Sequence, residues 1–505
     1  MIPFIDRFID RITMYRLVLW YLVALVLVAM MLGALHLIAI DPIALALSTV
    51  LVLAGGWIAN QIFARVFGAI PNIESVYITG LIIVLIMDPA PLGVLPAAGA
   101  IVFASAWAMA SKFIFSLRRR HVFNPAAIGV ALPALLLDHP ATWWVSGQVW
   151  LMPLVIIGGL LVVRKLRRFD LVLAFAAANL LVTVLTGDPS DMLQSVRFAL
   201  VDSPFFFFAF VMLTEPLTAP QAKVWRVVYG ALVGALAAPN VAIGGYYFTP
   251  EVALLAGNLL TLLVSPQGRV VLTLARIEQA AAGVYDYVFQ PDRELRFAAG
   301  QYLEWTLPLP DGDSRGNRRY FTIASAPAEE HLRLGVKIVP NGSAFKRGLS
   351  RLQPGDRIVA SQLAGNFTLP RDKRKKLAFI AGGIGVTPFR SMLEELLDAQ
   401  ASRPITMLYG NNRIDEIVYA DVLKRARQEL GIQTWYAVRD ATGATPDMHI
   451  GFIDGSMIRE RIPDFKERTF YVSGPQAMVS ATRQALLKLG VPRRRIKLDF
   501  FPGLA

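Results

Sequence analysis

A glycine-rich turn in the second half of the sequence has the residue types and spacing of an anion-binding site. The apolar run "KLAFIA" leads into "GGIGVTP", where Gly382, Gly383 and Gly385 precede Thr387 and Pro388. Glycines let a backbone turn tightly and approach a diphosphate, and the amides and dipole of a helix N-terminus attract that anion. The pattern predicts a phosphate-binding turn with Thr387 as helix N-cap and Pro388 as first helical residue. An ordinary strand-to-helix connection is the plainer alternative.

Two acidic residues end apolar runs in the first half and predict a second, chemically different site. "IMDPAP" places Asp88, and "LTEPLTAP" places Glu215, directly after an apolar segment. A carboxylate at the centre of a membrane costs roughly 2.5 to 3.5 kcal/mol, and a helix C-terminus disfavours negative charge. Both acids therefore need a cation, a proton or hydrogen-bond donors. The predicted membrane site consists of Asp88, Asn124, Thr214, Glu215 and Thr218.

Each acidic motif is followed by a longer apolar segment and then by a second shared signature, "FNPAAIGVA" or "FTPEVALLA". The interval is 37 residues from Asp88 to Pro125 and 35 residues from Glu215 to Pro250. Five crossings separate the members of each pair, so the two halves should run in opposite directions. The pattern is typical of an inverted-topology repeat whose short broken helices meet near a pseudo-two-fold axis. Proline at helix ends and starts, as ordinary punctuation, is the alternative.

Composition divides the chain of 505 residues into a membrane half and a soluble half. Overall, 55% of the residues are hydrophobic, 17% are charged and the mean hydropathy is +0.50. Residues 15–266 carry few charges, whereas 267–505 have an ordinary soluble composition. The N-terminal apolar stretch is too long for a signal peptide and lacks a small-residue cleavage site, so we interpret it as a retained transmembrane helix. The sequence predicts ten crossings, near 15–40, 43–66, 76–87, 92–115, 122–137, 148–164, 170–186, 197–213, 224–242 and 249–265.

Positive charge gathers in alternate connections of the membrane half, as in "RRR" at 118–120 and "RKLRR" at 164–168. By the positive-inside rule, the protein is predicted to be multi-pass in the inner (cytoplasmic) membrane, within the lipid bilayer, with its soluble half in the cytoplasm. This distribution explains the net charge of +13 without nucleic acid as a partner. The run "RDKRKK" at 371–376 is interpreted as a solvated linker, with a position near anionic lipid as the alternative.

Cysteine and histidine usage limits the redox chemistry of this chain. The sequence contains no cysteine, which excludes disulfides, Cys-ligated iron–sulfur clusters and thiol chemistry within it. Haem ligation between helices needs stacked pairs of histidines, and of the five histidines only His36 lies well inside an apolar segment. We therefore predict no metal site.

The soluble half changes its pattern once. Short alternating apolar runs such as "RVVLTLARI" and "YDYVFQP" predict a small antiparallel β-barrel. After Pro370, strands alternate with helices, which predicts an α/β doubly wound parallel sheet. With the polytopic α-helical membrane part, the sequence predicts three domains, at 1–266, 267–370 and 371–505.

The membrane half resembles the NqrB/RnfD family of membrane subunits from ion-translocating NADH:quinone and ferredoxin:NAD oxidoreductases. The likeness covers roughly 70–265 and rests on "ITGLIIVLI", the connection from Lys112 to "FNPAA", and "FVMLTEPLTAP". The last resembles the family's T-D-P-x-T-x-P, with Glu215 for Asp. Family members bind FMN covalently through the Thr of S-G-A-T, whereas the corresponding loop here reads "DHPATWWVSGQVW". The resemblance therefore leaves a non-covalent FMN or a quinone as the candidate occupant.

Residues 267–505 resemble the ferredoxin-NADP reductase family, because "RYFTIASAP", "VPNGSAF", "GGIGVTP" and "YVSGP" occur in that family's order. Arg319, Phe321 and Thr322 match its R-x-[YF]-[ST] motif. The resemblance implies that Arg319 neutralises the FAD diphosphate, that Phe321 packs on the isoalloxazine and that the Thr322 hydroxyl hydrogen-bonds the reactive N5. The predicted FAD domain is thus the barrel at 267–370, and the predicted NAD(P)H domain is the α/β segment at 371–505.

The same resemblance supplies the other predicted site residues. Ser473 stands where the family usually has Cys and would approach the nicotinamide, which makes Thr322, Phe321 and Ser473 the predicted catalytic set. Phe500 or Phe501 would place an aromatic ring over the flavin. Arg413 would meet either a 2′-phosphate or the ribose edge, so NADH and NADPH both stay open. The remaining cofactor-binding predictions are Tyr320, Gly342, Ser343, Gly382, Gly383, Gly385, Thr387, Gly474 and Pro475.

Together these patterns predict a membrane-bound, FAD-dependent NAD(P)H oxidoreductase. Cytoplasmic NAD(P)H would reduce FAD, and electrons would pass to a second flavin or a quinone, to an electron-carrier protein, or across the membrane. Two alternatives stay open: a redox-regulated transporter or ion-translocating protein, and a reductase merely anchored by its helices. Substitution of Asp88 and Glu215 separates them, because an anchor should tolerate Asn and Gln without loss of electron flow.

Overall fold

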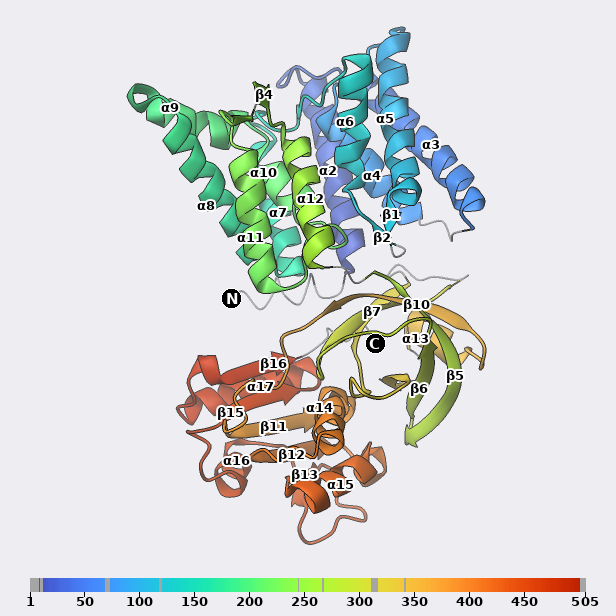
Figure 1. Cartoon of the computed structure of the whole chain (residues 1–505), viewed down its shortest axis with the longest axis vertical. Helices are drawn as coiled ribbons and strands as arrows, with labels where there is room; N and C mark the ends of the chain where they lie inside the picture. Colours follow the sequence, from blue (N-terminus) through green and yellow to red (C-terminus); the bar gives the residue numbers. More distant parts are fainter. Residues whose placement is uncertain are drawn as a thin grey trace. The chain divides into compact units, whose positions relative to one another are not determined.

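Two units follow one another along the chain in the structure, which is a computed structural model. It describes residue 9 and residues 12–68, 73–117, 120–243, 245–265, 268–309, 317–339 and 342–499. The first unit, Met1–Gly268, is helical, and the second, Arg269–Ala505, contains two large sheets (Figure 1). Phe500 and Phe501, predicted to cover the flavin, lie outside the described residues.

Each of the ten predicted apolar segments of the first unit overlaps a helix. Four helices are long and apolar enough to cross a membrane: α2 (Met14–Ala34), α3 (Pro42–Val66), α5 (Leu95–Ile114) and α8 (Phe169–Thr186). A pair bent by 57°, Pro189–Asp202 and Phe205–Met212, makes a fifth if it is one span. The shorter helices are α4 (Ile73–Ile86), α6 (Pro125–Leu137), α7 (Met152–Leu166), α11 (Lys223–Leu236) and α12 (Pro250–Val264). The described residues thus contain four or five spans, and the count of ten crossings stays a prediction.

The bent pair is the most irregular part of the first unit. It consists of η1 (Pro189–Asp191), α9 (Met192–Arg197), η2 (Phe198–Asp202), α10 (Phe205–Phe207) and η3 (Phe208–Met212). Both η2 and η3 are π-helical, and the break falls at Ser203 and Pro204, where proline cannot continue the preceding helix. The segment that leads to Glu215 is therefore a short, separate helix.

The helices α6 and α12 both begin at a proline in the first turn. Asn124 caps α6, its side chain accepting from Ala127 N, and Thr249 precedes α12. A short antiparallel pair precedes each: β1 (Ser116–Leu117) with β2 (Arg120–His121), and β3 (Ala242–Ile243) with β4 (Tyr246–Tyr247). Figure 1 shows β1 and β2 at one end of this unit and β4 at the other. The two helices therefore start from opposite ends.

The second unit begins with a six-stranded antiparallel sheet in the order β8-β7-β10-β5-β6-β9. Alternate side chains, among them Leu272, Phe289 and Trp305, are buried and form a core of their own. The sequence predicted a small antiparallel β-barrel, and the structure has an antiparallel sheet that forms a half-barrel. Its elements are β5 (Val270–Ala281), β6 (Val284–Pro291), β7 (Tyr302–Thr306), β8 (Arg318–Thr322), β9 (Leu332–Lys337), α13 (Ala344–Ser350) and β10 (Arg357–Ala364).

A six-stranded parallel sheet follows, in the order β14-β13-β12-β11-β15-β16. Successive residues of β11 pack on opposite faces: Phe379 lies in the core with α14 and α15, and Ile380 lies in the core with α16 and α17. The strand order reverses between β11 and β15, which is where ligands bind in such sheets. The elements are β11 (Leu377–Gly382), η4 (Gly383–Val386), α14 (Thr387–Asp398), β12 (Ile405–Asn411), η5 (Ile414–Glu416), α15 (Ala420–Leu430), β13 (Gln433–Val438), β14 (His449–Ile450), α16 (Gly455–Arg461), β15 (Thr469–Ser473), α17 (Gln476–Lys488), η6 (Arg493–Arg495) and β16 (Ile496–Asp499).

Two residues of α14 join the sheets within this unit. Arg390 donates to Ala324 O at 2.7 Å and to Glu329 Oε1 at 2.7 Å, and Ser391 Oγ donates to Ser325 O at 2.7 Å. Arg390 and Ser391 are both buried. The start of α14 is thereby held against the loop that follows β8.

Candidate functional site

Strand β8 presents the predicted flavin-binding motif on two faces. Arg319 lies opposite Trp305 and Phe321 opposite Leu303 in the ladder with β7, so both side chains share the face of the barrel core. Tyr320 and Thr322 take the other face. The structure therefore brings Arg319 and Phe321 together and separates them from Tyr320.

The loop before α13 lies beside Arg319 and Phe321. Ser343 caps α13, its side chain accepting from Lys346 N, and Gly342 N donates to Val339 O at 3.0 Å. Phe345 in the first turn packs on Phe321 with ring centroids 5.7 Å apart, and the Arg319 guanidinium lies 5.4 Å from the Phe345 ring centre. A cation, a half-buried ring and a helix start thus share one place, which fits a flavin with a diphosphate.

Tyr320 belongs to a different, polar group. Its hydroxyl lies 3.1 Å from Glu304 Oε2 and 3.3 Å from Gln362 Oε1, and its ring meets Tyr302 edge-on. Glu304 is buried and also pairs with Arg318 at 3.4 Å. These contacts occupy the Tyr320 hydroxyl within the protein.

The glycine-rich turn forms the connection from β11 to α14, as the sequence predicted. A Cβ on Gly385 would overlap the backbone of Ser473 and Gly474, and one on Gly382 would overlap Met478. Gly383 has φ of +52° and open space where a Cβ would point. Two glycines therefore permit close packing between the turn and the Ser473–Gly474 loop, and the third leaves room for a ligand to approach the backbone.

The helix after this turn starts one residue earlier than predicted. Val386, not Thr387, is the N-cap of α14, and Thr387 and Pro388 are already helical. The 3₁₀ turn η4 brings the chain into helical geometry before Thr387, so its hydroxyl donates back to Ile384 O at 3.2 Å. The prediction of Thr387 as a cap was wrong for this reason.

Three side chains from different elements converge at the end of β15. Ser473 is the ladder partner of Asp499, the last described residue of β16. Asp499 Oδ2 lies 3.5 Å from Thr322 Oγ1 on the barrel. Pro475 follows Gly474 and begins α17 as its N-cap. Ser473, predicted to approach the nicotinamide, and Thr322, predicted to contact the flavin, are thus linked through Asp499, which the sequence analysis did not single out.

Arg413 lies apart from this convergence, just beyond β12. Its side chain is 62% exposed and pairs with Asp415 at 2.6 Å. Nearby, Arg439 stacks over the exposed ring of Phe452 at 4.9 Å and donates to Asn412. Arg413 can therefore turn toward an anionic ligand at little cost, because exposed ion pairs are weak.

Asp286 and Lys346 are among the ionisable groups of this unit whose pKa values are shifted by burial. Burial raises the pKa of Asp286, although the Arg333 guanidinium at 2.9 Å acts in the opposite direction. Burial lowers the pKa of Lys346, and the charge of Lys337 lowers it further. Lys346 follows Ser343 in α13, so an anion at this helix start would relieve its electrostatic cost.

In the first unit, Glu215 joins the ends of two helices from opposite halves. Its Oε2 accepts from Asn124 Nδ2 at 2.9 Å and from Thr218 Oγ1 at 2.7 Å, and its Oε1 lies 3.2 Å from His121 Nε2. The backbone N of Asn124 donates to Asn258 Oδ1 at 2.7 Å, which adds α12 to the group. We call Glu215, His121, Asn124, Thr218 and Asn258 the Glu215 group.

Two neighbours complete the surroundings of the Glu215 group. The buried hydroxyl of Thr214 donates to Phe210 O at 2.7 Å rather than to Glu215. The ammonium of Lys112 donates to Ser75 Oγ at 3.0 Å and to Thr79 Oγ1 at 3.2 Å, and its charge interacts with that of Glu215. The predicted residues Asn124, Glu215 and Thr218 therefore meet, whereas Thr214 closes the preceding helix.

Asp88 lies with a different set of residues. Its exposed carboxylate accepts from Thr142 Oγ1 at 2.9 Å. The next residue, Trp143, donates from its backbone to Ile86 O at 2.8 Å and from its indole to Glu251 Oε2 at 3.2 Å. Glu251 is buried in the first turn of α12, near the end marked by β4 (Figure 1). Asp88 and the Glu215 group thus lie at opposite ends of the unit.

The sequence analysis missed His121, Asn258, Trp143, Glu251 and Asp499. Glu251 was visible within "FTPEVALLA", where an acid directly follows Pro250. His121 lies only three residues before Asn124. Asn258 and Asp499 carry no such local signal, because their contacts reach residues 134 and 177 positions away in the chain.

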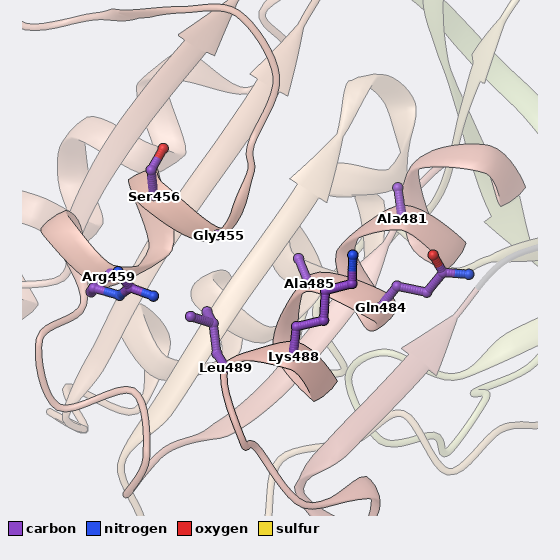
Figure 2. A pocket seen from close by; sticks show the side chains of 8 residues that line it. All are labelled: Gly455, Ser456, Arg459, Ala481, Gln484, Ala485, Lys488 and Leu489. Atoms are coloured by element: carbon purple, nitrogen blue, oxygen red, sulfur yellow. The ribbon is translucent and has the colours of Figure 1, made fainter.

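A surface depression of about 560 Å³ lies between α16 and α17. Figure 2 shows Arg459 and Ser456 from α16 and Gln484 and Lys488 from α17 around it. No residue predicted from the sequence lines it. The depression is therefore separate from the convergence at Ser473.

Comparison with protein families identifies two segments. Residues 142–267 match the NQR2, RnfD, RnfE family. This segment is similar to that family. Residues 379–484 match the oxidoreductase NAD-binding domain. Both resemblances inferred from the motifs are confirmed over these residues.

Curated relatives match the second half of the chain. Flavohemoprotein A of Dictyostelium discoideum is 23% identical over 239 residues, with 45% of this chain and 58% of that protein covered. The flavohemoprotein of Candida albicans (strain SC5314 / ATCC MYA-2876) is 28% identical over 240 residues, with the same two shares covered. The chain therefore spans little more than half the length of these relatives.

Solved structures match the same half of the chain. The flavohem-like FAD/NAD-binding domain of nitric oxide dioxygenase from Vibrio cholerae O1 biovar El Tor is 23% identical, with a TM-score of 0.42, and the match covers 46% of this chain and 99% of that one. A ferredoxin NADP⁺ reductase from Neisseria gonorrhoeae, with bound FAD and NADP, is 18% identical, with a TM-score of 0.40 and the same coverage of each chain.

Proposed function

We propose that the protein is a membrane-bound FAD-dependent NAD(P)H oxidoreductase that passes electrons from cytoplasmic NAD(P)H to an acceptor in the membrane. The convergence of Ser473, Asp499 and Thr322 carries this proposal. Asp499 lies between the loop that we expect to meet the nicotinamide and the strand that we expect to meet the flavin. The matched NAD-binding domain and NQR2, RnfD, RnfE segment supply the two ends of the electron path.

On the flavin side, the chain's own residues bind and orient. Arg319 would neutralise the diphosphate, and Phe321 would supply a flat apolar surface. Both side chains lie on the face of the sheet that packs against α13. Ser343 would bring the start of α13 to the diphosphate, whereas the Gly342 amide already donates to Val339 O. Thr322 holds a hydroxyl at the reactive edge, and Asp499 orients that hydroxyl. Bound FAD would accept a hydride from NAD(P)H and release the electrons singly.

On the nucleotide side, backbone rather than side chain forms the binding surface. The amides of η4 and α14 face the switch point of the sheet, and open space at Gly383 admits the diphosphate. Gly385 and Gly474 let the turn pack against the Ser473 loop, and this loop would direct a bound nicotinamide toward Thr322. Arg413 is the proposed contact to the 2′-phosphate of NADPH or the ribose of NADH.

In the membrane unit, we assign Asp88 and Glu215 to the two halves of an inverted repeat. Their locations at opposite ends, and the pairing of each acidic segment with the start of a helix or loop from elsewhere in the unit, support this assignment. The repeat would hold a non-covalent FMN or a quinone as acceptor. We retain ten crossings, a cytoplasmic soluble half, and domains at 1–266, 267–370 and 371–505 as parts of the proposal.

The decisive experiment uses the full chain purified in detergent. Flavin is counted before and after acid precipitation, and NAD(P)H oxidation is followed in liposomes with and without a quinone. We expect releasable FAD and oxidation that accelerates when quinone is added. Oxidation that proceeds only with soluble dyes, at a rate indifferent to quinone, would reduce the membrane unit to an anchor.

A second candidate function is ion or solute translocation by the membrane unit. The interaction of Lys112 with Glu215, which places opposite charges near the ends of several helices, favours it. Electrical current across liposomes without NAD(P)H oxidation would support this candidate over electron transfer.

A further inference from the structure

Three basic segments meet at the amino edge of the parallel sheet. Because β11, β15 and β16 are parallel neighbours, the residues that precede them reach the same edge. These segments, 371–376, 464–468 and 493–495, together carry ten basic and three acidic side chains. We call them the basic edge. The three segments are far apart in the sequence, and the order of the strands brings them together into one patch.

Contacts confirm that the segments touch. Thr469 N donates to Lys376 O at 2.9 Å, and the Arg495 guanidinium donates to Lys466 O. Burial lowers the pKa of Lys497, and the nearby charge of Lys375 lowers it further. Like charges are therefore held close together at this edge.

The acids of the basic edge are already engaged. Asp464 pairs with Arg468 at 2.6 Å and with Lys376 at 3.2 Å, and Glu467 pairs with Lys376 at 2.7 Å. Asp372 accepts from a backbone amide. Seven exposed basic side chains form no ion pair with any described residue: Arg371, Lys373, Arg374, Lys375, Lys466, Arg493 and Arg494. Their mutual repulsion is uncompensated within the described part of the chain.

Nucleotide binding does not account for this charge. The glycine turn and the Ser473 loop lie at the carboxyl ends of β11 and β15, which is the opposite edge of the same sheet. A lipid surface is the polyanion that always lies near this unit, because the unit is covalently attached to the membrane unit. Five residues, 265–269, separate α12 from β5, so covalent attachment gives membrane headgroups a high effective concentration.

We propose that the basic edge docks on anionic phospholipid headgroups. Lys and Arg side chains close to an anionic bilayer each gain about 1 kcal/mol, so several together make a strong contact that salt weakens. Docking by the amino edge turns the carboxyl edge, with its nucleotide turn, away from the lipid. The content of anionic lipid then sets how the reductase unit is oriented. This inference concerns a surface outside the proposed redox site.

The test compares the full chain in nanodiscs of phosphatidylcholine alone and of phosphatidylcholine with phosphatidylglycerol. Hydrogen–deuterium exchange is measured over 371–376 and 493–497. We expect slower exchange of both segments in the anionic discs, with the difference abolished at high salt. The double variant Arg374→Gln/Lys375→Gln should lower the docking equilibrium constant roughly 30-fold.

A matched control is Lys424→Gln/Arg427→Gln on α15, which removes the same two charges from another exposed surface. It should retain the protection in anionic discs. Equal exchange in the two lipids, or protection that the Arg374/Lys375 variant keeps, would overturn the proposal. Protection in phosphatidylcholine discs that appears only with an added acidic protein would assign the edge to a protein partner instead. NAD(P)H oxidation with a soluble dye should not change in either variant, so this result is independent of the redox proposal.

Discussion

The candidate site of the reductase unit is formed mainly by backbone, whereas that of the membrane unit is formed by side chains. At the switch point of the parallel sheet, backbone packs on backbone, and Gly385 leaves no space beside Gly474. In the membrane unit, the Glu215 group is centred on one carboxylate, which accepts from the side chains of Asn124 and Thr218. The first arrangement should tolerate no added volume, and the second should tolerate no change of charge or donor pattern.

The largest effect is expected for Gly385→Ala. The new methyl group would overlap the backbone of Gly474 and push the turn away from the Ser473 loop. A displacement of about 1 Å can cost about 100-fold in rate, so flavin reduction by NAD(P)H in stopped flow should slow by about that factor. Gly455→Ala, at a glycine of the same unit where a new Cβ would make only ordinary contacts of 3.9 to 4.0 Å with Leu489, is the control and should retain the rate. Equal losses in both variants would indicate general destabilisation.

Glu215→Gln tests the side-chain hydrogen bonds of the membrane unit. The new amide would direct N–H groups at donors from Asn124, Thr218 or His121, which should lower the free energy of unfolding by roughly 1 to 3 kcal/mol. We expect a lower thermal midpoint in detergent and slower quinone reduction in liposomes, with dye reduction unchanged. Asp88→Asn, at the exposed acid that ends the other short apolar segment, is the matched control. Its free energy of unfolding should change by about 0.5 kcal/mol or less. Full quinone reduction by Glu215→Gln would favour the anchor alternative.

Thr322→Val and Asp499→Asn test the one part of the reductase site that we propose to depend on a contact between side chains. Their contact of 3.5 Å is long, so removing either group should slow flavin reduction about tenfold, below the usual range for acid–base groups. The KM for NAD(P)H should stay constant, since neither group lies at the glycine turn. If KM rises and the rate is kept, Asp499 supports nucleotide binding instead.

The smallest effect is expected for Arg413→Gln. The side chain is exposed and its ion pair with Asp415 is weak, so its loss should change affinity by at most about fivefold. A higher KM for NADPH with an unchanged KM for NADH would identify Arg413 as the 2′-phosphate contact. Equal changes for both nucleotides would assign it to the ribose edge.

Much of the fold could be predicted from the sequence because its patterns are local. Apolar segments located the helices that the structure describes in the membrane unit, and the change from short alternating runs to strand–helix alternation located the two sheets. The glycine turn was found with its strand and helix, although the 3₁₀ turn moved the start of α14 to Thr387. Motif types, segment identities and the family resemblances were therefore accessible without coordinates.

Local patterns could not show which distant residues meet. The Thr322–Asp499 contact, the His121–Glu215 pair and the separation of Asp88 from Glu215 all depend on the path of the chain in space. The basic edge has the same origin, since three segments become neighbours only because β11, β15 and β16 are adjacent. The sequence by itself determined which groups are available, through hydropathy and backbone freedom. Tertiary structure decided which of them share a site, because strand order and helix entry are set by packing across the whole unit.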